Sequence, residues 1–551
     1  MKKLVLPILL AVTAVVSTAP LALAQAVCPA APTPITVPGT ISSDVTWTSN
    51  NVYLLTDRVY VTSGATLTIQ PGTIIKGTGL GTLVIERGAR LIADGTAAQP
   101  IVFTSNQPAG MRNTGDWGGI VILGRAPINQ PGTPIIEGVP GRSFGGTDPN
   151  DNSGILRYVR IEYCGIALTP NNEINGLTMG GVGAGTIIDY VQVYASGDDS
   201  FEWFGGNVNA KHLVAVSAVD DDFDTDFGYS GKVQYAVSVR NPAVDDVSGS
   251  TAFESDNDAN GSTLTPITSP VFSNVSAFLQ NVPSTTRFTR ALHLRRNTQI
   301  SIFNSVFTGW PQGLTLDGGP AQTNATNGSL VLKNNVFAGI ASPYTQQSGG
   351  SYNVQGFWEA AANANQTLST IAALNLNADN FSFANTNGTP NGVPAFNLPA
   401  NSPLVGGAAF SDAKLGGGFF DNVAYRGAFG PAGTANWAAG WTNFNPQTTC
   451  YNRPGLTLAN KQADEQVQGL SVAPNPTEGA AKLTFELKKA NVVTVRVLDV
   501  TGRTVAVVRN GQKLSTGVQN VELPTSLQAG LYVASVTTGE TTQAVRFVVT
   551  K

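Results

Sequence analysis

The residues best suited to chemistry are carboxylates that recur in three short segments between Ser196 and Ala259. These segments read S-G-D-D-S-F-E-W-F-G-G, V-D-D-D-F-D-T-D-F-G and A-F-E-S-D-N-D-A. When Phe201, Phe223 and Phe253 are aligned, each is followed by an acid, and the copies lie 22 and 30 residues apart. Repeats at such spacing are typical of the coils of a solenoid. The alignment therefore predicts acids stacked above one another on one side of a solenoid.

Stacked carboxylates repel one another unless something neutralises them. Equivalent side chains in adjacent coils lie about 4.8 Å apart, and at an effective dielectric near 20 two charges at this distance repel by roughly 3 kcal/mol. Between Asp198 and Asp258 the basic residues are Lys211, Lys232 and Arg240. A cation that prefers oxygen ligands, Ca²⁺ above all, would relieve this repulsion. The candidate metal ligands are Asp199, Glu202, Asp222, Asp224, Asp226, Glu254 and Asp256.

The following coil offers bases in the same register. The segment 291–297 (A-L-H-L-R-R-N) aligns with 252–258 (A-F-E-S-D-N-D) at an offset of 39. This alignment predicts that His293 and Arg295 end the ladder and pair with the acids beneath them. A second interpretation stays open, in which the acids are solvated turn residues that accept hydrogen bonds from backbone N–H groups.

The elements that must carry these residues are short strands separated by turns. Charged residues are 12% of the 551, about half the usual ~25%, and 60 residues are glycine. Residues 61–67 (V-T-S-G-A-T-L) match 85–91 (I-E-R-G-A-R-L) at an offset of 24. Strands and Gly turns that alternate without helices predict an all-β chain built on a parallel β-helix. The net charge of −4 gives no electrostatic footprint for a nucleic-acid partner.

Composition divides the chain into six parts. An Ala-rich stretch predicts a helix, an aromatic-rich stretch predicts a cap over the last coil, and about seven short strands at the C-terminal end predict an Ig-like β-sandwich. The predicted parts are a signal peptide (1–24), a lead-in (25–44), the parallel β-helix (45–400) with its helical segment near 357–376, the cap (401–450), a linker (451–469) and the sandwich (470–551).

The first residues have the composition of a signal peptide. Lys2 and Lys3 form a charged region, residues 4–16 are apolar, and the small residues Ala22 and Ala24 predict cleavage before Gln25. No other apolar run is long enough to span a bilayer. The sequence therefore predicts an exported protein with no transmembrane segment after cleavage.

Three cysteines leave an odd thiol in an exported protein. Cys164 lies in a strand-like run and is predicted to be buried. Cys28 and Cys450 flank the repeat region, and a disulfide between them requires the chain to fold back along the solenoid.

The C-terminal part resembles the sorting domain of proteins exported by the bacterial type IX secretion system. The segments 474–476 (P-N-P), 499–503 (D-V-T-G-R), 530–533 (G-L-Y-V) and 545–551 (V-R-F-V-V-T-K) carry this resemblance. The residues taken as the sorting signal are Pro474, Asn475, Pro476, Asp499, Gly502, Arg503, Gly530 and Tyr532. The resemblance implies that the type IX machinery is a partner, and that the protein is anchored at the outer membrane or released.

The central region resembles right-handed, pectin-lyase-like β-helix proteins that carry this sorting domain. Segments 64–76 (G-A-T-L-T-I-Q-P-G-T-I-I-K), 99–105 (Q-P-I-V-F-T-S) and 116–119 (D-W-G-G) carry the resemblance, which covers residues 45–447. The resemblance implies the fold, and the group has no agreed activity.

Two functions of different classes follow. The first is a non-enzymatic surface protein, adhesive or glycan-binding, whose partner is a polysaccharide or another surface ligand. The second is an extracellular polysaccharide lyase, which on this fold combines acids, Ca²⁺ and an Arg base, or a glycoside hydrolase. The pair Asp198-Asp199 resembles the acids of polygalacturonases, although the other motifs of that family are absent from the sequence. The candidate catalytic residues are Asp198, Asp199, Asp222 and Arg295.

Overall fold

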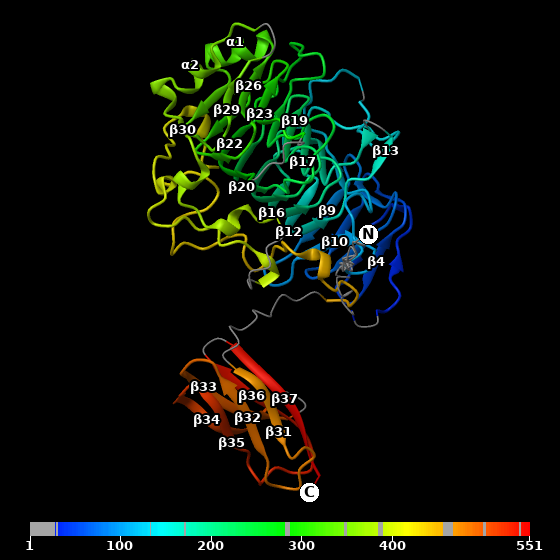
Figure 1. Ribbon diagram of the computed structural model, residues 1–551. Helices are drawn as coiled ribbons and strands as arrows, with labels where there is room; N and C mark the ends of the chain where they lie inside the picture. Colours follow the sequence, from blue (N-terminus) through cyan, green and yellow to red (C-terminus); the bar gives the residue numbers. More distant parts are fainter. Residues whose placement is uncertain are drawn as a thin grey trace, which may run out of the picture.

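Two long parallel sheets wound around one core make up most of the molecule (Figure 1). The computed structural model describes residues 28, 31–132, 134–169, 172–280, 287–346, 350–383, 390–455, 467–499, 503–538 and 541–550. The signal-peptide prediction lies outside these residues. The predicted parallel β-helix followed by a C-terminal β-sandwich is confirmed.

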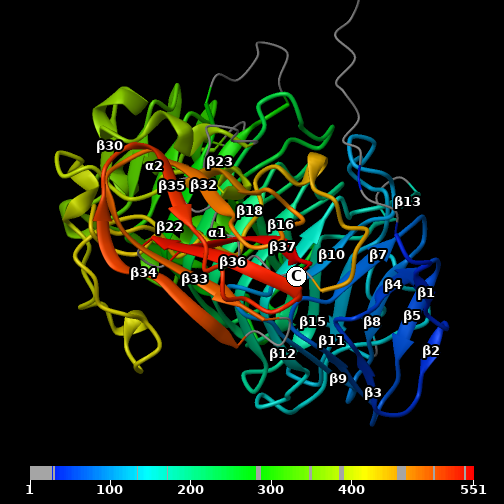
Figure 2. The ribbon, with the colours of Figure 1, turned by 90° about the horizontal axis from the view of Figure 1, so that it is seen from below.

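The larger sheet, sheet A, has 17 strands and the smaller, sheet B, has 11. Sheet A contains β1 (Ile35–Thr36), β3 (Val45–Trp47), β4 (Val52–Leu55), β6 (Thr66–Ile69), β7 (Ile74–Gly77), β9 (Arg90–Asp94), β10 (Ile101–Ser105), β12 (Gly154–Glu162), β16 (Ile187–Tyr194), β18 (Asn209–Val216), β20 (Lys232–Val239), β22 (Val271–Phe278), β24 (Ser301–Phe303), β25 (Val306–Thr308), β27 (Val331–Lys333), β28 (Val336–Ala338) and β30 (Gln366–Leu368). Sheet B contains β2 (Thr40–Ile41), β5 (Arg58–Val61), β8 (Thr82–Ile85), β11 (Ile120–Leu123), β15 (Leu177–Val182), β17 (Phe201–Gly206), β19 (Phe223–Asp226), β21 (Phe253–Ser255), β23 (Arg290–Arg295), β26 (Gln312–Asp317) and β29 (Ser342–Thr345). Figure 2 shows the coils following one another in chain order across the stack.

The strand registers confirm the repeats found in the sequence. Val61 pairs with Ile85 in β5 and β8, the predicted offset of 24. The lead-in, however, already forms part of the stack, because β1 pairs with β4 and β2 pairs with β5. These two-residue strands are too short to leave a periodic signal, so the sequence placed the first coil too late.

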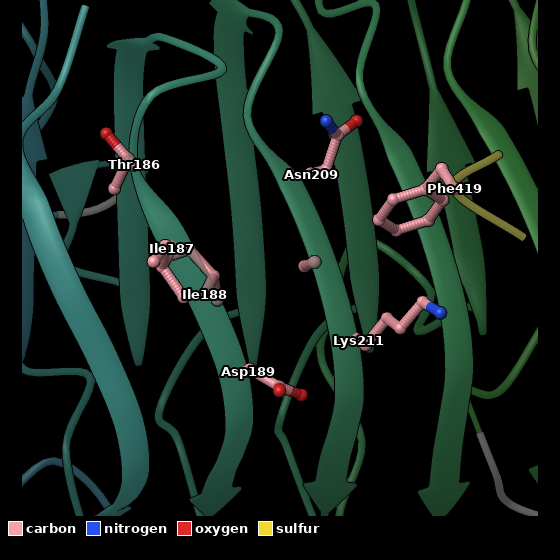
Figure 3. A pocket seen from close by; sticks show the side chains of 8 residues that line it. Thr186, Ile187, Ile188, Asp189, Asn209, Lys211 and Phe419 are labelled. Atoms are coloured by element: carbon pink, nitrogen blue, oxygen red, sulfur yellow. The ribbon is translucent and has the colours of Figure 1, made fainter. Parts of the chain in front are cut away.

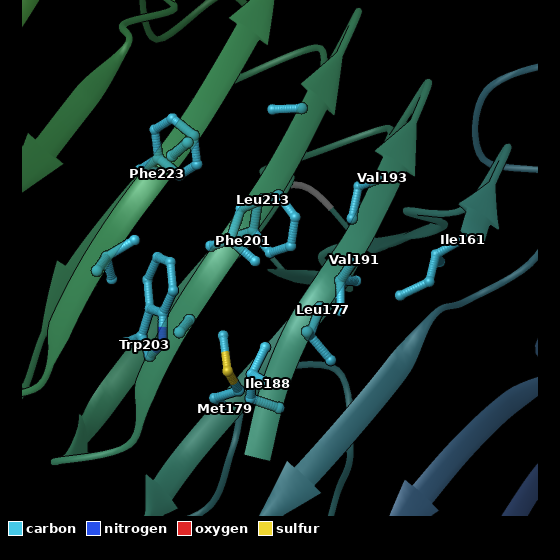
Figure 4. Packing of buried hydrophobic residues seen from close by; sticks show 14 of the residues in the cluster. Ile161, Leu177, Met179, Ile188, Val191, Val193, Phe201, Trp203, Leu213 and Phe223 are labelled. Atoms are coloured by element: carbon cyan, nitrogen blue, oxygen red, sulfur yellow. The ribbon is translucent and has the colours of Figure 1, made fainter. Parts of the chain in front are cut away.

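Alternation of side chains along each strand fills the space between the sheets. The phenylalanines that align the acidic segments point inward, with ring centroids 5.8 Å apart between Phe201 and Phe223 and 5.1 Å apart between Phe223 and Phe253. Figure 4 shows the rings of Phe201 and Phe223 packed against aliphatic side chains of sheet A such as Val191 and Leu213. Since successive residues of a strand face opposite sides, the residue after each phenylalanine must face outward.

Long strands of sheet A bend at one residue with left-handed backbone. Tyr158, Tyr190, His212 and Tyr235 hold this place in successive coils, with φ between 50° and 62°. Their rings stack on the outside of the sheet, with centroids 4.4, 4.1 and 5.2 Å apart. In the later coils asparagines take over this position, a residue type that tolerates left-handed backbone.

The helix predicted near 357–376 is wrong. In its place are a short helix α2 (Val354–Trp358), two 3-10 turns (Ala361–Asn363 and Ile371–Leu374) and the last coil strand β30. Asn365 accepts a hydrogen bond from the Asn335 N–H and donates to the Leu332 carbonyl, which extends the coils by one more turn. The ring of Trp358 is buried against Phe337, with centroids 3.8 Å apart. These contacts outweigh the helix propensity of the alanines.

The segment 390–450, here called the return segment, does not cap the last coil as predicted. It runs back along the outer face of sheet A and buries its aromatic side chains against several coils. Gln192, Gln234 and Asn304 on the sheet each donate to and accept from one residue of its backbone. A disulfide joins Cys450 to Cys28, so the chain does fold back along the stack.

Cys164 is a buried free thiol, as predicted.

The predicted linker begins too early and ends too late, because Tyr451 is buried against the stack and β31 starts at Val467. Two further helical and hairpin elements decorate the stack: α1 (Gly319–Asn327) and the β13–β14 hairpin (Ala167–Thr169 and Asn172–Glu173).

The C-terminal sandwich has its own core and two antiparallel sheets. One contains β31 (Val467–Ala473), β32 (Lys482–Leu487) and β35 (Gly517–Glu522), and the other β33 (Asn491–Leu498), β34 (Thr504–Leu514), β36 (Gly530–Thr538) and β37 (Thr541–Val549). Asn475, from the predicted sorting signal, donates to the Arg546 carbonyl and accepts from the Val548 N–H. The P-N-P segment therefore binds along β37 and covers part of its edge. Gly502 lies outside the described residues.

Candidate functional site: an acidic ladder on sheet B

Acids on three adjacent strands of sheet B, followed by a histidine on the fourth, form the ladder that the repeats predicted. Glu202, Asp224 and Glu254 are in register on β17, β19 and β21, and His293 follows on β23. Each acid faces outward because the preceding phenylalanine faces the core. The predicted offset of 39 between the last two coils is confirmed.

A second row of acids lies in the turns that precede these strands. Asp199 accepts a hydrogen bond from the Asp221 N–H at 2.7 Å, and Asp221 accepts one from the Thr251 N–H. The Asn175 side chain accepts a hydrogen bond from the Asp199 N–H at 3.1 Å. The turn acids thus accept hydrogen bonds from backbone N–H groups of the next coil, as the second interpretation expected, but Asp199 and Asp221 are buried and not solvated.

The two rows bring carboxylates close together. The oxygens of Asp199, Glu202 and Asp224 lie within 4.8 Å of one another, which unites three of the predicted metal ligands. Asp198 and Asp199 form a second such group with Asp220. Asp199 belongs to both groups, so the carboxylates form a continuous chain.

A third group contains residues that the sequence did not indicate. Glu137 and Glu173 lie within the same 4.8 Å limit of Asp198. Glu137 comes from the long excursion between β11 and β12, and Glu173 from the β13–β14 hairpin. Both are inserted between coils, so the repeat pattern carries no trace of them.

Burial and mutual repulsion make these acids hard to ionise. Burial, followed by the charges of neighbouring acids, raises the pKa of each turn and ladder acid in the group Asp198, Asp199, Glu202, Asp221 and Asp224 well above its ordinary value. The same causes raise the pKa of Asp220 to about 6 and that of Asp226 to about 8. Within the described part of the chain, Asp224 Oδ1 is buried and has no hydrogen-bond partner. No basic side chain of the described residues forms an ion pair with Asp198, Asp199, Glu202 or Asp224, and the charge of Arg295 reaches Asp224 only from the other end of the ladder.

The other end of the ladder is neutralised, as predicted. Arg295 Nε lies 2.9 Å from Asp256 Oδ1, and Arg295 also pairs with Glu254. His293 lies between two carboxylates, with Nδ1 3.0 Å from Glu254 and Nε2 3.2 Å from Asp317. Burial alone would raise the pKa of Glu254, but the hydrogen bond to His293 and the charge of Arg295 outweigh it and lower the pKa. Arg296 adds a further ion pair, 2.8 Å from Asp256.

A pocket of about 340 Å³ adjoins this neutralised end. It is lined by Asn260, Gly261, Arg295, Arg296, Asp317, Gly318 and Pro320. The two arginines give it a positive wall, so acidic and basic surfaces meet where the ladder ends.

Asp222, which the sequence predicted as a metal ligand and a catalytic residue, does not lie in the acidic ladder. Its carboxylate is fully buried, 3.1 Å from Arg240 Nη1 and 2.5 Å from Ser238 Oγ. Asp222 immediately precedes the inward-facing Phe223, and its side chain turns toward sheet A. The structure therefore separates it from the ladder and gives it a buried ion pair.

The chain resembles two families over separate stretches. Residues 39–391 match the pectate-lyase-like β-helix domain, and residues 471–550 match the secretion system C-terminal sorting domain. No curated relative matches the chain. Among the described residues no helix has the length and apolar character needed to cross a bilayer.

The sorting domain establishes the route of export. Proteins with this domain leave the cell through type IX secretion, and the protein is accordingly destined for the cell surface or the extracellular space. The first match spans more than half of the 551 residues. The chain thus belongs to the family of pectate-lyase-like β-helix domains.

Proposed function

We propose that the protein is a non-enzymatic surface module whose acidic ladder binds Ca²⁺ and, through it, a glycan or another surface ligand. The observation that carries this proposal is the cluster of Asp199, Glu202 and Asp224, whose ligand oxygens lie within 4.8 Å of one another. Ca²⁺ takes six to eight oxygen ligands and prefers carboxylates. The donor set fits, because it offers oxygen alone and includes the buried, unpartnered Asp224 Oδ1 among the described residues.

The arrangement of the bases favours binding over catalysis. A lyase of this fold would use an arginine as base, but the charges of Glu254 and Asp256 outweigh the effect of burial and raise the pKa of Arg295 above its ordinary value. An arginine held in this way loses its proton even less readily than a free one. Asp199 is in turn occupied by a backbone N–H.

Metal content and thermal stability test the proposal directly. Protein dialysed against Ca²⁺ and then against metal-free buffer should retain Ca²⁺ in stoichiometric amount, and EDTA should lower its melting temperature. The double variant Glu202→Gln/Asp224→Asn should lose both effects, because amides lack the charge that holds the ion. Asp94→Asn, which alters an exposed ion pair with Arg157, serves as the matched control. Wild-type protein without bound Ca²⁺ and with an unchanged midpoint would refute the cation site.

Catalysis remains the second candidate, favoured by the raised pKa values of Asp220 (about 6) and Asp226 (about 8). A carboxylic acid that stays protonated near neutral pH can act as a general acid. The test is release of reducing or unsaturated sugar ends from a broad panel of polysaccharides, with Asp220→Asn and Asp226→Asn as variants. Activity that both variants lose while remaining folded would replace the binding proposal with an enzymatic one.

A further inference from the structure

A second pocket lies on the outer face of sheet A, whereas the acidic ladder lies on sheet B. It encloses about 240 Å³ between β16, β18 and the return segment (Figure 3). Its lining is Thr186, Ile187, Ile188, Asp189, Asn209, Ala210, Lys211 and Phe419. In Figure 3 the ring of Phe419 stands close to Lys211 at one end, and Ile187 and Asp189 line the other end.

The charged groups in this pocket already have partners. Asp189 Oδ1 lies 2.7 Å from His212 Nδ1. Lys211 Nζ lies 2.8 Å from Asp421 and 5.1 Å from the centre of the Phe419 ring. With two carboxylates beside one ammonium group, the surroundings do not favour an anionic ligand.

The walls combine apolar surface with a few polar groups. Ile187 is 40% exposed, and the Phe419 ring adds aromatic surface. Asp189, Asn209 and Lys211 supply hydrogen-bond acceptors and donors at the rim. Ligand pockets typically pair apolar walls with a small number of oriented polar groups, and drug-sized ligands occupy about 300–1,000 Å³. A pocket just below this range suits a ligand of one ring.

We propose that this pocket binds a neutral sugar residue. A pyranose presents C–H groups, which can pack on Phe419 at one end of the pocket and on Ile187 at the other, and hydroxyl groups at its edge, which can reach Asp189 and Asn209. A neutral sugar adds no charge to groups that are already paired. The site is separate from the cation-binding face, so either proposal can fail without the other.

The pocket is held open by its scaffold. β16 and β18 are paired directly, with Ile187 opposite Asn209 and Asp189 opposite Lys211. Phe419 is fixed through Asp421, whose N–H donates to Gln234 at 2.8 Å and whose carbonyl accepts from Gln234 at 2.9 Å. The site therefore needs little rearrangement on binding, which lowers the cost of association.

The test is titration of the full chain with methyl glycosides of glucose, galactose and mannose, followed by ligand-observed NMR. EDTA is included to remove Ca²⁺ from the acidic ladder, and methyl galacturonoside serves as the anionic comparison. At least one neutral glycoside should bind at millimolar concentration, more tightly than the uronide. Ile187→Trp, which fills the pocket from an exposed position, and Phe419→Ala should each weaken binding by about ten-fold or more.

Phe410→Ala is the matched control, because Phe410 packs in the same hydrophobic cluster as Phe419 but does not line the pocket. It should leave binding unchanged. Melting temperatures of all variants separate loss of the site from loss of the fold. If no neutral glycoside binds, or if binding survives in folded Ile187→Trp, the pocket is not a sugar site.

Discussion

At the scale of single residues, the side of the strand or turn from which an acid projects decides what it does. Asp222 and Asp224 are two residues apart on either side of Phe223, yet the first is a buried partner of Arg240 and the second belongs to the acidic ladder. Sequence alignment brought both into one candidate site because it records position in the repeat. It does not show that a turn residue can rotate toward a buried arginine.

Replacing Asp222 should therefore affect stability. Asp222→Ala leaves Arg240 buried without its counter-charge, and removing one partner of a buried ion pair costs about 3–5 kcal/mol. Urea unfolding should reveal a loss of this size. Asp94→Ala, which breaks an exposed ion pair with Arg157, should change stability by less than about 1 kcal/mol. An equally small effect of Asp222→Ala would mean that the ion pair is not buried as described.

The raised pKa values of the ladder acids predict a pH dependence of stability. Asp226 has a pKa of about 8 in the folded protein, against about 4 in an unfolded chain. Between these values the folded state binds more protons than the unfolded state, so stability falls as pH rises from about 4 to about 8. In EDTA the melting temperature should decrease over this range, and Ca²⁺ should reduce the decrease.

The variant Asp226→Asn isolates one contribution to this slope. It should flatten the dependence measured in EDTA, since an amide has no proton to lose. A melting temperature that rises between pH 5 and 8 in EDTA would contradict the assignment of raised pKa values to these acids.

At the scale of elements, ladders of side chains between coils hold the stack together. Asn335 is fully buried; it accepts from the Ser305 N–H at 3.0 Å and donates to the Ile302 carbonyl at 2.8 Å. Asp199 and Asp221 accept backbone N–H groups of the next coil in the acidic turns. Backbone N–H groups between coils are thus bound by a neutral amide in one part of the stack and by carboxyl groups in the other.

Asn335→Ala should leave both backbone groups without a partner. Each unsatisfied buried group costs about 1–3 kcal/mol, so we expect a loss of about 2–6 kcal/mol in denaturant unfolding. Asn335→Asp keeps the acceptor for Ser305 but places a buried carboxylate beside the Ile302 carbonyl, so it should be at least as unstable as Asn335→Ala. If Asn335→Ala unfolded at the same denaturant concentration as the wild type, the two hydrogen bonds would contribute nothing.

Periodic elements could be predicted from the sequence, and inserted elements could not. The offsets of 22, 30 and 39 residues gave the correct pairing of β17, β19, β21 and β23, because each coil repeats an inward phenylalanine or leucine followed by an outward polar residue. Glu137 and Glu173 come from segments that occur once, so no repeat reveals where they lie. The failed helix prediction has a similar cause, because propensity is local and the contacts of Asn365 and Trp358 are with other coils.

At the scale of the whole molecule, the return segment turns a stack of local contacts into a closed structure. In a solenoid each coil contacts only its neighbours, so the ends can open independently. Here the return segment contacts the coil of Asn304 first and the coil of Gln192 later, and then reaches the beginning of the stack. Arg112 donates to the Pro446 and Thr449 carbonyls, and Tyr451 donates to buried Glu162. The aromatic residues that were predicted to cap the last coil therefore cover the outer face of sheet A.

The disulfide between Cys28 and Cys450 closes this structure over a sequence separation of 422 residues. Because the cost of closing a loop grows with its length, such a cross-link mainly restricts the unfolded chain and typically contributes about 2–4 kcal/mol. Cys450→Ser should lower the melting temperature in non-reducing buffer, and dithiothreitol should lower that of the wild type to the same value. The reductant should leave the variant unchanged, since Cys164 is already a free thiol. If hydrogen exchange in the variant rose only near Cys450, the contacts of the return segment with sheet A would be enough to keep it bound without the disulfide. We instead expect faster exchange in the first coils as well, because the disulfide ties the start of the chain to a segment bound along sheet A.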